Sequence, residues 1–392
     1  MIKRIASVMI VVSMSASAQE WVDFTPSTGL AGWTVFEGAW KSEEGEFTGQ
    51  AESGNEAAIV FDREFADFEW EMEILAPAAG AAEIVFRGHR LPILPVVQPS
   101  EGEVPMGVYG YSIGVTAEED AVSIAFVDRL RKGELVKARK AAIAEFKSGE
   151  WNRVAISAQG ESIAVTINGT PALSGESSTY SKGILALTTS SEIRVRGMRV
   201  KDKDRVGEWQ PLFNGQNFDG WQVWGTEEWV VENSEIIGRS GPAKSEGYLS
   251  TLQTWKDFHV RGSFKTLGEG NYGLFFHSTI AYDDKNYPVI TGIQGEVEPG
   301  YPGSSGWLYE SYKRGWLVEP DKATLPAYAL RVGEWNEIEI MSKGNRMVTW
   351  VNGVNVMDWR DPAPNVVEGS FALQLHAGGV DGIMWKDIYV KK

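Results

Sequence analysis

The densest group of residues that could do chemistry lies in the C-terminal half of this chain. Residues 292–298 read Gly-Ile-Gln-Gly-Glu-Val-Glu, which places Gln294, Glu296 and Glu298 at alternate positions. In a β-strand, next-but-one side chains share one face and lie about 7 Å apart. Such a polar row either lines a concave sheet or faces solvent, and its position alone favours neither.

The segment that follows combines aromatic rings with charged groups. It contains Trp307, Leu308, Tyr309, Glu310, Ser311, Tyr312, Lys313, Arg314, Gly315 and Trp316. Aromatic planes stack on the flat apolar faces of sugar rings, and carboxylate and guanidinium groups form bidentate hydrogen bonds with neighbouring hydroxyls. We therefore expect a sugar site that includes Trp307, Tyr309 and Arg314. The alternative is that these rings form ordinary core under a loop.

Histidine supplies the third element of this chemistry. The chain has four histidines, and His376 stands on a predicted strand that could converge with the strands of Glu296 and Glu310. A histidine near carboxylates suits proton transfer close to neutral pH, although a single strand histidine is often structural. We take Glu296, Glu310 and His376 as the candidate catalytic residues.

The composition removes several other kinds of chemistry. The chain contains no cysteine, which excludes disulfides, thiolate metal sites and a thiol nucleophile. Asp283, Asp284 and Asn286 could offer oxygen ligands to a divalent cation such as Ca²⁺, but so short a run is typical of a solvated loop. The sequence therefore identifies no cofactor and supports no metal.

The charge balance restricts the partners. The chain has 37 Lys+Arg and 53 Asp+Glu, a formal net charge of −16. Nucleic-acid binding requires a dense basic face, and an anionic membrane surface requires a polybasic stretch. We expect an oligosaccharide or glycoside substrate, and neither nucleic acid nor a membrane anchor.

The first residues resemble a targeting segment. Lys3 and Arg4 precede an apolar run over residues 5–14, and Ala16-Ser17-Ala18 follows it. A positive start, a short apolar core and small residues at a cleavage point are the parts of a secretory signal peptide. The run is shorter than the ~20 residues that span a bilayer. We predict a signal peptide over residues 1–18, cleaved near Ala18, and a periplasmic or secreted mature protein.

The rest of the chain repeats itself once. Trp33 corresponds to Trp221 and Trp151 to Trp335, at offsets of 221 − 33 = 188 and 335 − 151 = 184. The turn 168–169 likewise corresponds to 352–353, both Asn-Gly. A single long period indicates two copies of one domain, because solenoid repeats are ~20–50 residues long. We assign residues 19–200 and 208–392 to the two copies and residues 201–207 to a linker.

Each copy is predicted to be all-β. Phe68, Trp70, Met72 and Ile74 alternate with glutamates, and the segment around Phe258 repeats this alternation. A period of two buries one face of a strand, and Asn-Gly is a strong hairpin signal because both residues tolerate positive φ. Many short strands between glycine-rich turns indicate a β-sandwich or jelly roll. We therefore expect two such sandwiches in tandem.

The positions where the copies differ are the more informative ones for function. Residues that both copies share are expected to serve the fold. Gln294 and Glu296 correspond to Ser112 and Gly114 of the first copy, and His376 corresponds to Ser190. The second copy is therefore expected to carry the chemistry, and the first copy a structural or accessory role.

The second copy resembles a known family. The motifs that carry the resemblance are Leu212-Phe213-Asn214-Gly215, Asp219-Gly220-Trp221, Trp229-Val230-Val231-Glu232-Asn233, Gly270-Asn271-Tyr272-Gly273, Gly333-Glu334-Trp335-Asn336 and Leu373-Gln374-Leu375-His376. In this order they are similar to the 3-keto-disaccharide hydrolase family, also described as 3-keto-glucoside 1,2-lyase/hydratase. The resemblance spans roughly residues 208–392 and is faint in the first copy. This sequence departs from the family pattern at three positions. The family often has Arg where His277 stands, an aromatic residue where Ile293 stands and Phe where Trp385 stands.

The resemblance implies two tandem concanavalin A-like jelly-roll sandwiches and an enzyme that acts on sugars oxidised at C3. A C3 ketone acidifies the C2 proton, so that a base can remove it, the C1 substituent leaves by elimination, and water adds back. On this hypothesis Glu296 and Glu310 supply base and acid and His376 shares the proton transfer. Gln294 and Arg314 hold the ketone or hydroxyls, and His277 stands at a substrate-anchoring position.

Two other functions stay open at this point. A lectin-like protein would bind glycans through aromatic and amide groups without an acid–base set, and a jelly roll accommodates either function. An ordinary retaining glycosidase would use two carboxyl groups ~5–5.5 Å apart, which the row of Gln294, Glu296 and Glu298 resembles.

Overall fold

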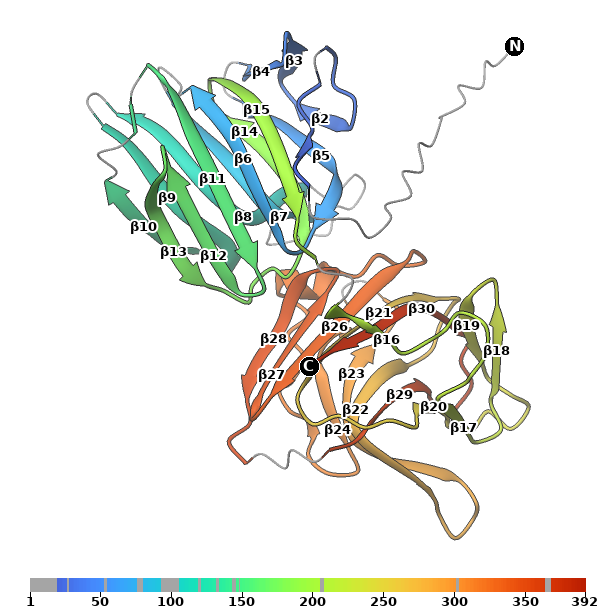
Figure 1. Ribbon diagram of the computed structural model, residues 1–392. Helices are drawn as coiled ribbons and strands as arrows, with labels where there is room; N and C mark the ends of the chain where they lie inside the picture. Colours follow the sequence, from blue (N-terminus) through green and yellow to red (C-terminus); the bar gives the residue numbers. More distant parts are fainter. Residues whose placement is uncertain are drawn as a thin grey trace, which may run out of the picture.

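A computed structural model describes most of the chain. It covers residues 20–26, 28–52, 55–75, 80–92, 106–118, 121–131, 134–142, 146–147, 149–204, 208–300, 303–363 and 368–392. The signal peptide predicted for residues 1–18 and residues 205–207 of the predicted linker lie outside these ranges. Figure 1 shows the strands gathered in two lobes that follow one another along the chain.

The first lobe consists, within the described residues, of two antiparallel sheets. One sheet contains, in spatial order, β13 (Thr170–Glu176), β12 (Ser162–Ile167), β11 (Trp151–Gln159), β6 (Phe68–Leu75), β15 (Glu192–Asp202), β4 (Glu46–Gln50) and β3 (Ala39–Glu43), with β1 (Val22–Asp23) paired to β15. The other contains β10 (Glu134–Ala142), β9 (Ala121–Arg131), β8 (Met106–Glu118), β7 (Ala81–Pro92), β14 (Gly183–Thr189), β5 (Ala57–Phe65) and β2 (Trp33–Glu37). Because β15 extends to Asp202, the predicted linker begins inside a strand.

The second lobe repeats this strand order. Its first sheet contains β28 (Val354–Arg360), β27 (Arg346–Val351), β26 (Asn336–Lys343), β21 (Phe258–Thr266), β30 (Ile383–Lys391), β19 (Glu235–Arg239) and β18 (Glu228–Glu232), with β16 (Gln210–Pro211) paired to β30. Its second sheet contains β25 (Gly315–Trp316), β24 (Leu308–Ser311), β23 (Pro288–Val297), β22 (Tyr272–Tyr282), β29 (Ser370–Leu375), β20 (Gly247–Thr251) and β17 (Trp221–Trp224). We call this second sheet the β23 sheet. A 3-10 helix, η2 (Leu325–Tyr328), lies between β25 and β26.

The core of each lobe lies between its two sheets. In the first lobe the rings of Phe68 on β6 and Phe86 on β7 meet edge to face with centroids 6.2 Å apart. Phe258 on β21 and Phe276 on β22 form the same contact in the second lobe at 5.5 Å. These equivalent pairs join facing sheets, and all four rings are buried. The prediction of two tandem all-β sandwiches of jelly-roll type is therefore confirmed.

The two lobes are joined by specific contacts. Tyr180 of the first lobe forms a β-bridge with Val354 at the start of β28. The guanidinium of Arg346 on β27 donates to both carboxylate oxygens of Glu161 at 2.6 and 2.8 Å. Such bidentate pairs are among the stronger polar contacts in proteins. The first lobe is therefore anchored on the sheet of the second lobe that contains β27 and β28, which packs against the β23 sheet across the core.

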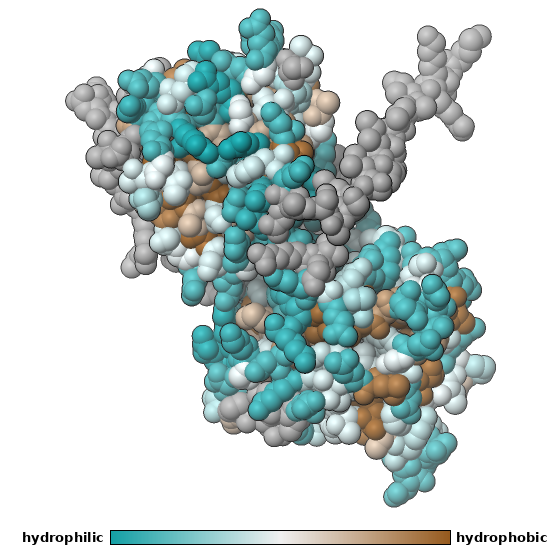
Figure 2. Space-filling view, viewed as in Figure 1, coloured by the Kyte–Doolittle hydropathy of each residue, from teal (hydrophilic) through white to brown (hydrophobic). Residues whose placement is uncertain are grey.

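The surface agrees with the acidic composition. In the view of Figure 2 hydrophilic side chains dominate both lobes, and hydrophobic surface is confined to smaller separate patches. In the part of the chain that the structure describes, no helix has the length and apolar character needed to cross a membrane.

Candidate functional site

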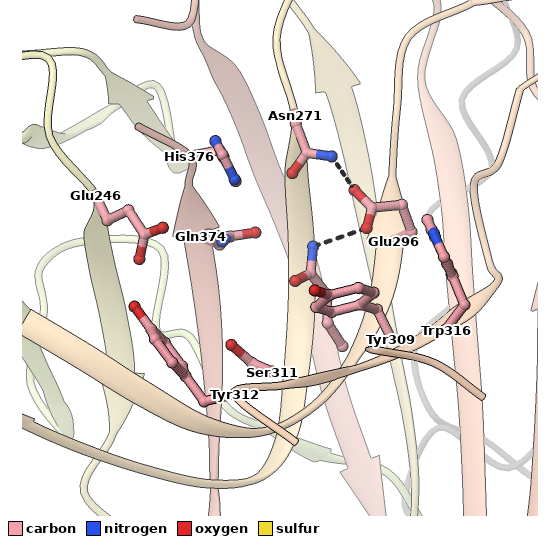
Figure 3. Close-up of a pocket in the computed structure, with 10 residues that line it drawn as sticks. Glu246, Asn271, Glu296, Tyr309, Ser311, Tyr312, Trp316, Gln374 and His376 are labelled. Carbon is pink, nitrogen blue, oxygen red and sulfur yellow. Dashed lines mark hydrogen bonds between the residues drawn. The ribbon is translucent and has the colours of Figure 1, made fainter. Parts of the chain in front are cut away.

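A pocket of about 430 Å³ opens on the outer face of the β23 sheet (Figure 3). It is lined by Glu246, Asn271, Gln294, Glu296, Tyr309, Ser311, Tyr312, Trp316, Gln374 and His376. These residues come from β23, β24, β25 and β29 and from the residues next to the ends of β20, β22, β24 and β29. The pocket therefore crosses most of the sheet and combines side chains that lie far apart in the sequence.

Strand alternation places the amide and the carboxylate of β23 in this pocket. Gly295 faces the opposite sheet so closely that a Cβ there would lie 2.7 Å from Ile340. Gln294 and Glu296, on either side of it, consequently point outward. Gly273 on β22 pairs with Glu296, and a Cβ at Gly273 would overlap the amide of Gln294. The absence of a side chain at Gly273 thus makes room for the polar row.

Glu296 is the most perturbed carboxyl group of the pocket. Its residue is 4% exposed, Asn271 donates to Oε1 at 2.5 Å, and Gln294 donates to Oε2 at 3.2 Å. Burial, reinforced by the charge of Glu298, raises the pKa of Glu296 to about 8, although the hydrogen bond from Asn271 opposes the rise. Glu296 is therefore mostly protonated at neutral pH and can donate a proton.

His376 lies at the end of β29, close to Asn271. Its backbone N–H donates to the Asn271 carbonyl at 3.2 Å, and its ring Nδ1 lies 2.9 Å from the carbonyl oxygen of Ala377. A carbonyl oxygen only accepts, so this contact assigns the proton to Nδ1 of a neutral ring. Nε2 is then left with a lone pair that can accept a proton. The imidazole is exposed and lines the pocket.

Two aromatic rings form one wall of the pocket. Tyr309 on β24 and Trp316 on β25 are neighbours in the sheet, and their rings meet edge to face with centroids 5.3 Å apart. Both side chains are half-buried and contribute to the lining. They present apolar surface beside polar groups, which is the arrangement that a sugar ring requires.

The carboxylate of Glu246 lies at the end of the pocket away from Glu296. The Tyr248 hydroxyl donates to the carboxylate of Glu246, and burial together with the Glu246 charge raises the pKa of Tyr248. A hydrogen bond from Gln374 opposes that rise. Oε1 of Gln374 is buried and has no hydrogen-bond partner among the described residues. It is therefore an acceptor that is available to a ligand.

Glu310 and Arg314 lie outside the pocket lining. Glu310 alternates with Tyr309 and Ser311 on β24, so its side chain points to the other face of the strand and is buried. Arg314 donates to Glu310 through Nε and to both carboxylate oxygens of Asp361 at 2.9 Å. The carboxylate and the guanidinium that the sequence suggested for catalysis and binding thus belong to an ion-pair cluster.

His277 also lies outside the pocket lining, in a position that the first lobe repeats. Its backbone is left-handed, with φ of 49°, and Nε2 lies 2.8 Å from the carbonyl oxygen of Lys256. Arg87, the equivalent residue, has φ of 47° and donates to the carbonyl of Ala66 at 2.9 Å. Each side chain ties the bulge of its own lobe to the turn at the equivalent position. Burial lowers the pKa of His277.

Two further sequence candidates serve the fold. Trp307 is buried and does not line the pocket, but its carbonyl accepts a hydrogen bond from the Glu296 backbone at 2.9 Å. Asp283 accepts from the backbone N–H groups of Lys285 and Tyr287 at 2.9 and 2.8 Å, which closes the β22–β23 hairpin. In the described ranges, no group of three or more His, Asp or Glu side chains is placed to hold a metal ion.

The structure brings together Gln294, Glu296, Tyr309 and His376 from the sequence candidates and adds other residues to them. The additions are Glu246, Asn271, Ser311, Tyr312, Trp316 and Gln374. Asn271 and Gln374 stand inside family-like motifs, so the motifs held a signal for them. Glu246 directly precedes the family-like motif Gly247-Tyr248-Leu249 but is not part of it, and only the folded sheet reveals its position.

The family is decided by a match across both lobes. Residues 20–201 and 208–391 each match the model of the 3-keto-alpha-glucoside-1,2-lyase-like domain. The chain belongs to this family. The first 3-keto-alpha-glucoside-1,2-lyase-like domain, in which the sequence motifs were faint, is thus a full copy. It has Ser112 and Gly114 where the second domain has Gln294 and Glu296.

Solved structures with a similar architecture each align with about one lobe. A candidate glycosyl hydrolase from Parabacteroides distasonis is 19% identical, covers 49% of this chain and 96% of its own, and has a TM-score of 0.35. The carbohydrate-binding module CBM66 from Bacillus subtilis is 17% identical, with 44% and 96% covered and a TM-score of 0.32. A Bacillus subtilis protein of unknown function with a galectin-like fold is 11% identical, with 47% and 94% covered and a TM-score of 0.36. No curated protein matches the chain.

Proposed function

We propose that the second domain cleaves 3-keto-glycosides by proton abstraction at C2, elimination at C1 and hydration, with net hydrolysis of the glycosidic bond. Membership of the 3-keto-alpha-glucoside-1,2-lyase-like family supports the substrate class. The observation that carries the proposal is Glu296, a buried carboxyl group with a pKa raised to about 8 at the floor of an open pocket. Perturbed acids in clefts are typical of catalytic sites.

The reaction needs a base and an acid in separate places. The base takes the C2 proton, the C2–H electron pair forms a C1–C2 double bond, and the C1–O bond breaks. The leaving oxygen takes a proton from the acid. Water then adds its hydroxyl to C1 and gives its proton to the ionised acid, and the protonated base returns its proton to C2, which restores both groups. We assign the base to Nε2 of His376, which has a free lone pair when Nδ1 carries the ring proton, and the acid to Glu296, which carries a proton at neutral pH.

Other residues hold the substrate and the acid. Asn271 and Gln294 orient the two oxygens of Glu296. Tyr309 and Trp316 supply an aromatic wall for a sugar face. Glu310 has no place in this scheme because its side chain is paired with Arg314 on the other side of β24.

The location of the protein is part of the proposal. We infer that residues 1–18 direct export and that the mature protein acts in the periplasm or outside the cell. N-terminal sequencing of the protein from its natural host tests this inference. A mature chain that begins near Gln19 supports export, and a chain that retains residues 1–18 overturns it.

One assay separates this reaction from lectin and glycosidase functions. The purified protein is offered a 3-keto disaccharide and its unoxidised parent in one mixture, and the products are followed by chromatography. Cleavage of the keto form alone supports the proposal. Cleavage of the parent supports an ordinary glycosidase, and binding without cleavage supports a lectin.

A matched pair of variants tests the residue assignment. Glu296→Gln keeps the size of the side chain but removes its proton, and should lower kcat by roughly 10²–10⁴-fold, the usual contribution of a general acid. Glu319→Gln is the control, since Glu319 is exposed and lies outside the pocket lining. Equal activity of the Glu296 variant and the wild type would remove Glu296 from the mechanism.

A further inference from the structure

The pocket has two ends that differ in chemistry. Figure 3 shows Asn271, Glu296 and Trp316 at one end and Glu246 and Tyr312 at the other. Gln374 lies between them, with its unpartnered Oε1 in the floor. The first end holds the proposed acid, so the second end is free to contact a different part of a bound molecule.

Tyr312 carries a backbone strain that packing does not explain. It stands in the turn after β24 with φ of 57°, a left-handed conformation that bulky side chains rarely adopt. Its residue is 66% exposed, so the ring contributes little to the core. Strained residues of this kind concentrate at binding and catalytic sites. The exposed ring lines the mouth of the pocket, where it can contact a bound molecule.

Glu246 faces Tyr312 with a fixed orientation. Its carboxylate accepts a hydrogen bond from the buried Tyr248 hydroxyl, which limits its rotation. Burial, then the charges of Glu246 and Asp283, raise the pKa of Tyr312, so its phenol stays a neutral donor. A carboxylate opposite an aromatic face can hold hydroxyl groups of a ring that stacks on that face.

The charge of the lining restricts what can enter. The described residues that line the pocket include the carboxyl groups of Glu246 and Glu296 and no lysine or arginine. Because Glu296 holds its proton, the negative charge is that of the Glu246 carboxylate, which repels anions in a partly desolvated site, and the described lining has no lysine or arginine to offset it. A phosphorylated or carboxylated ring is therefore disfavoured, and an uncharged one is accepted.

We propose that Glu246 and Tyr312 form a second subsite, which holds the leaving half of the glycoside and selects an uncharged, hydroxyl-bearing ring. This proposal rests on the proposed function, because the assignment of a leaving half depends on Glu296 as the acid. Oε1 of Gln374 accepts a hydrogen bond from a hydroxyl group at the junction of the two halves. The selectivity lies in the second lobe alone, since Glu246 corresponds to Glu56 of the first lobe but Tyr248 corresponds to Ala58.

The test compares a two-ring substrate with a one-ring substrate. The probes are the 3-keto form of an α-linked glucose disaccharide and methyl 3-keto-α-glucoside. For Tyr312→Gly the ratio of kcat/KM values, disaccharide over methyl glycoside, should fall about tenfold. Glycine adopts positive φ without strain, so the melting temperature should be equal or higher and unfolding cannot cause the loss. Tyr287→Ala, at an exposed tyrosine outside the pocket lining, is the control and should leave the ratio unchanged.

The second variant addresses the charge. Glu246→Gln should raise turnover of a 3-keto disaccharide whose leaving ring is a glucuronate, relative to the neutral disaccharide, by several-fold. An unchanged ratio in both variants, or an equal loss for both probes, overturns the subsite.

If the wild type cleaves no keto substrate, the proposed function fails, and calorimetric Kd values for the unoxidised disaccharide and methyl α-glucoside then decide the subsite. Tighter disaccharide binding that Tyr312→Gly abolishes supports it, and equal binding overturns it.

Discussion

Asn271 and Glu296 are joined side chain to side chain across neighbouring strands, with Nδ2 of Asn271 2.5 Å from Oε1 of Glu296. The carbonyl of Asn271 also accepts a hydrogen bond from the backbone N–H of His376 at 3.2 Å. One residue therefore connects the strand that carries the proposed acid with the strand end that carries the proposed base. This connection gives Asn271 a positioning role without direct participation in proton transfer.

Replacing Asn271 should change the pH dependence of the proposed activity. The hydrogen bond from Asn271 lowers the pKa of Glu296, so Asn271→Ala should raise that pKa above its value of about 8. An acid must be protonated to act, and activity is lost as pH rises through its pKa. The alkaline limb of the kcat/KM profile, measured between pH 6 and 10, should therefore move to higher pH. A limb that stays in place or moves to lower pH would contradict the assignment.

Glu296 should make the folded protein less stable at alkaline pH. In the unfolded chain the carboxyl group ionises near its ordinary pKa of 4.5, whereas in the folded state it holds its proton until about pH 8. Ionisation therefore favours the unfolded state increasingly between these two values. Glu296→Gln should exceed the wild type in free energy of unfolding at pH 8 by up to roughly 4 kcal/mol, since each pKa unit is worth about 1.4 kcal/mol.

The comparison for this prediction is made at two pH values. Thermal or urea unfolding of both proteins at pH 5 and pH 8 should show a difference that is small at pH 5 and large at pH 8. A difference that is the same at both values would mean that Glu296 affects stability through packing and not through its proton.

Arg314 should matter for stability more than for catalysis. Arg314→Met removes the cation that pairs with the buried carboxylate of Asp361 and leaves that of Glu310 with Lys313 at 3.6 Å, and weakly paired buried charges are costly. Because the Arg314 side chain is 37% exposed, solvent screening reduces the loss, and we expect about 2 kcal/mol in urea unfolding. The kcat for a 3-keto disaccharide should change little. A large loss of kcat with unchanged stability would mean that Arg314 takes part in substrate binding or catalysis.

Glu339 should make the contact between the lobes sensitive to acid. Burial of Glu339 opposes its ionisation. His259 of the second lobe and the hydrogen bond from Ser181 of the first lobe nevertheless hold the pKa of Glu339 down, at about 2. A carboxyl group with a lowered folded pKa stabilises the protein above its unfolded pKa, and this stability is lost as pH falls from about 4.5 toward 2. Glu339→Gln should be less stable than the wild type at pH 7, and the two should converge near pH 2. Calorimetric melting at several pH values measures this, and a constant gap would refute it.

The sequence by itself determined the fold and its duplication. Alternation of apolar and polar residues is a local property, because a strand exposes every second side chain to each face. The two copies follow from motifs such as Trp33 and Trp221 that recur in the same order, and family membership follows from the same motifs. These features depend on neighbouring positions and on repetition, which a single sequence displays directly.

Only the tertiary structure decided which polar residues share a site. Tyr309 and Glu310 are adjacent on a strand and so must face opposite sides, but the sequence does not say which side is the pocket. Glu310 faces Arg314, which also pairs with Asp361, whereas Glu296 and His376 line one pocket because β22 lies between β23 and β29 in the sheet. Glu246 enters the pocket from a strand separated from Glu296 by two others. Long-range strand order determines such meetings, and no local pattern encodes it.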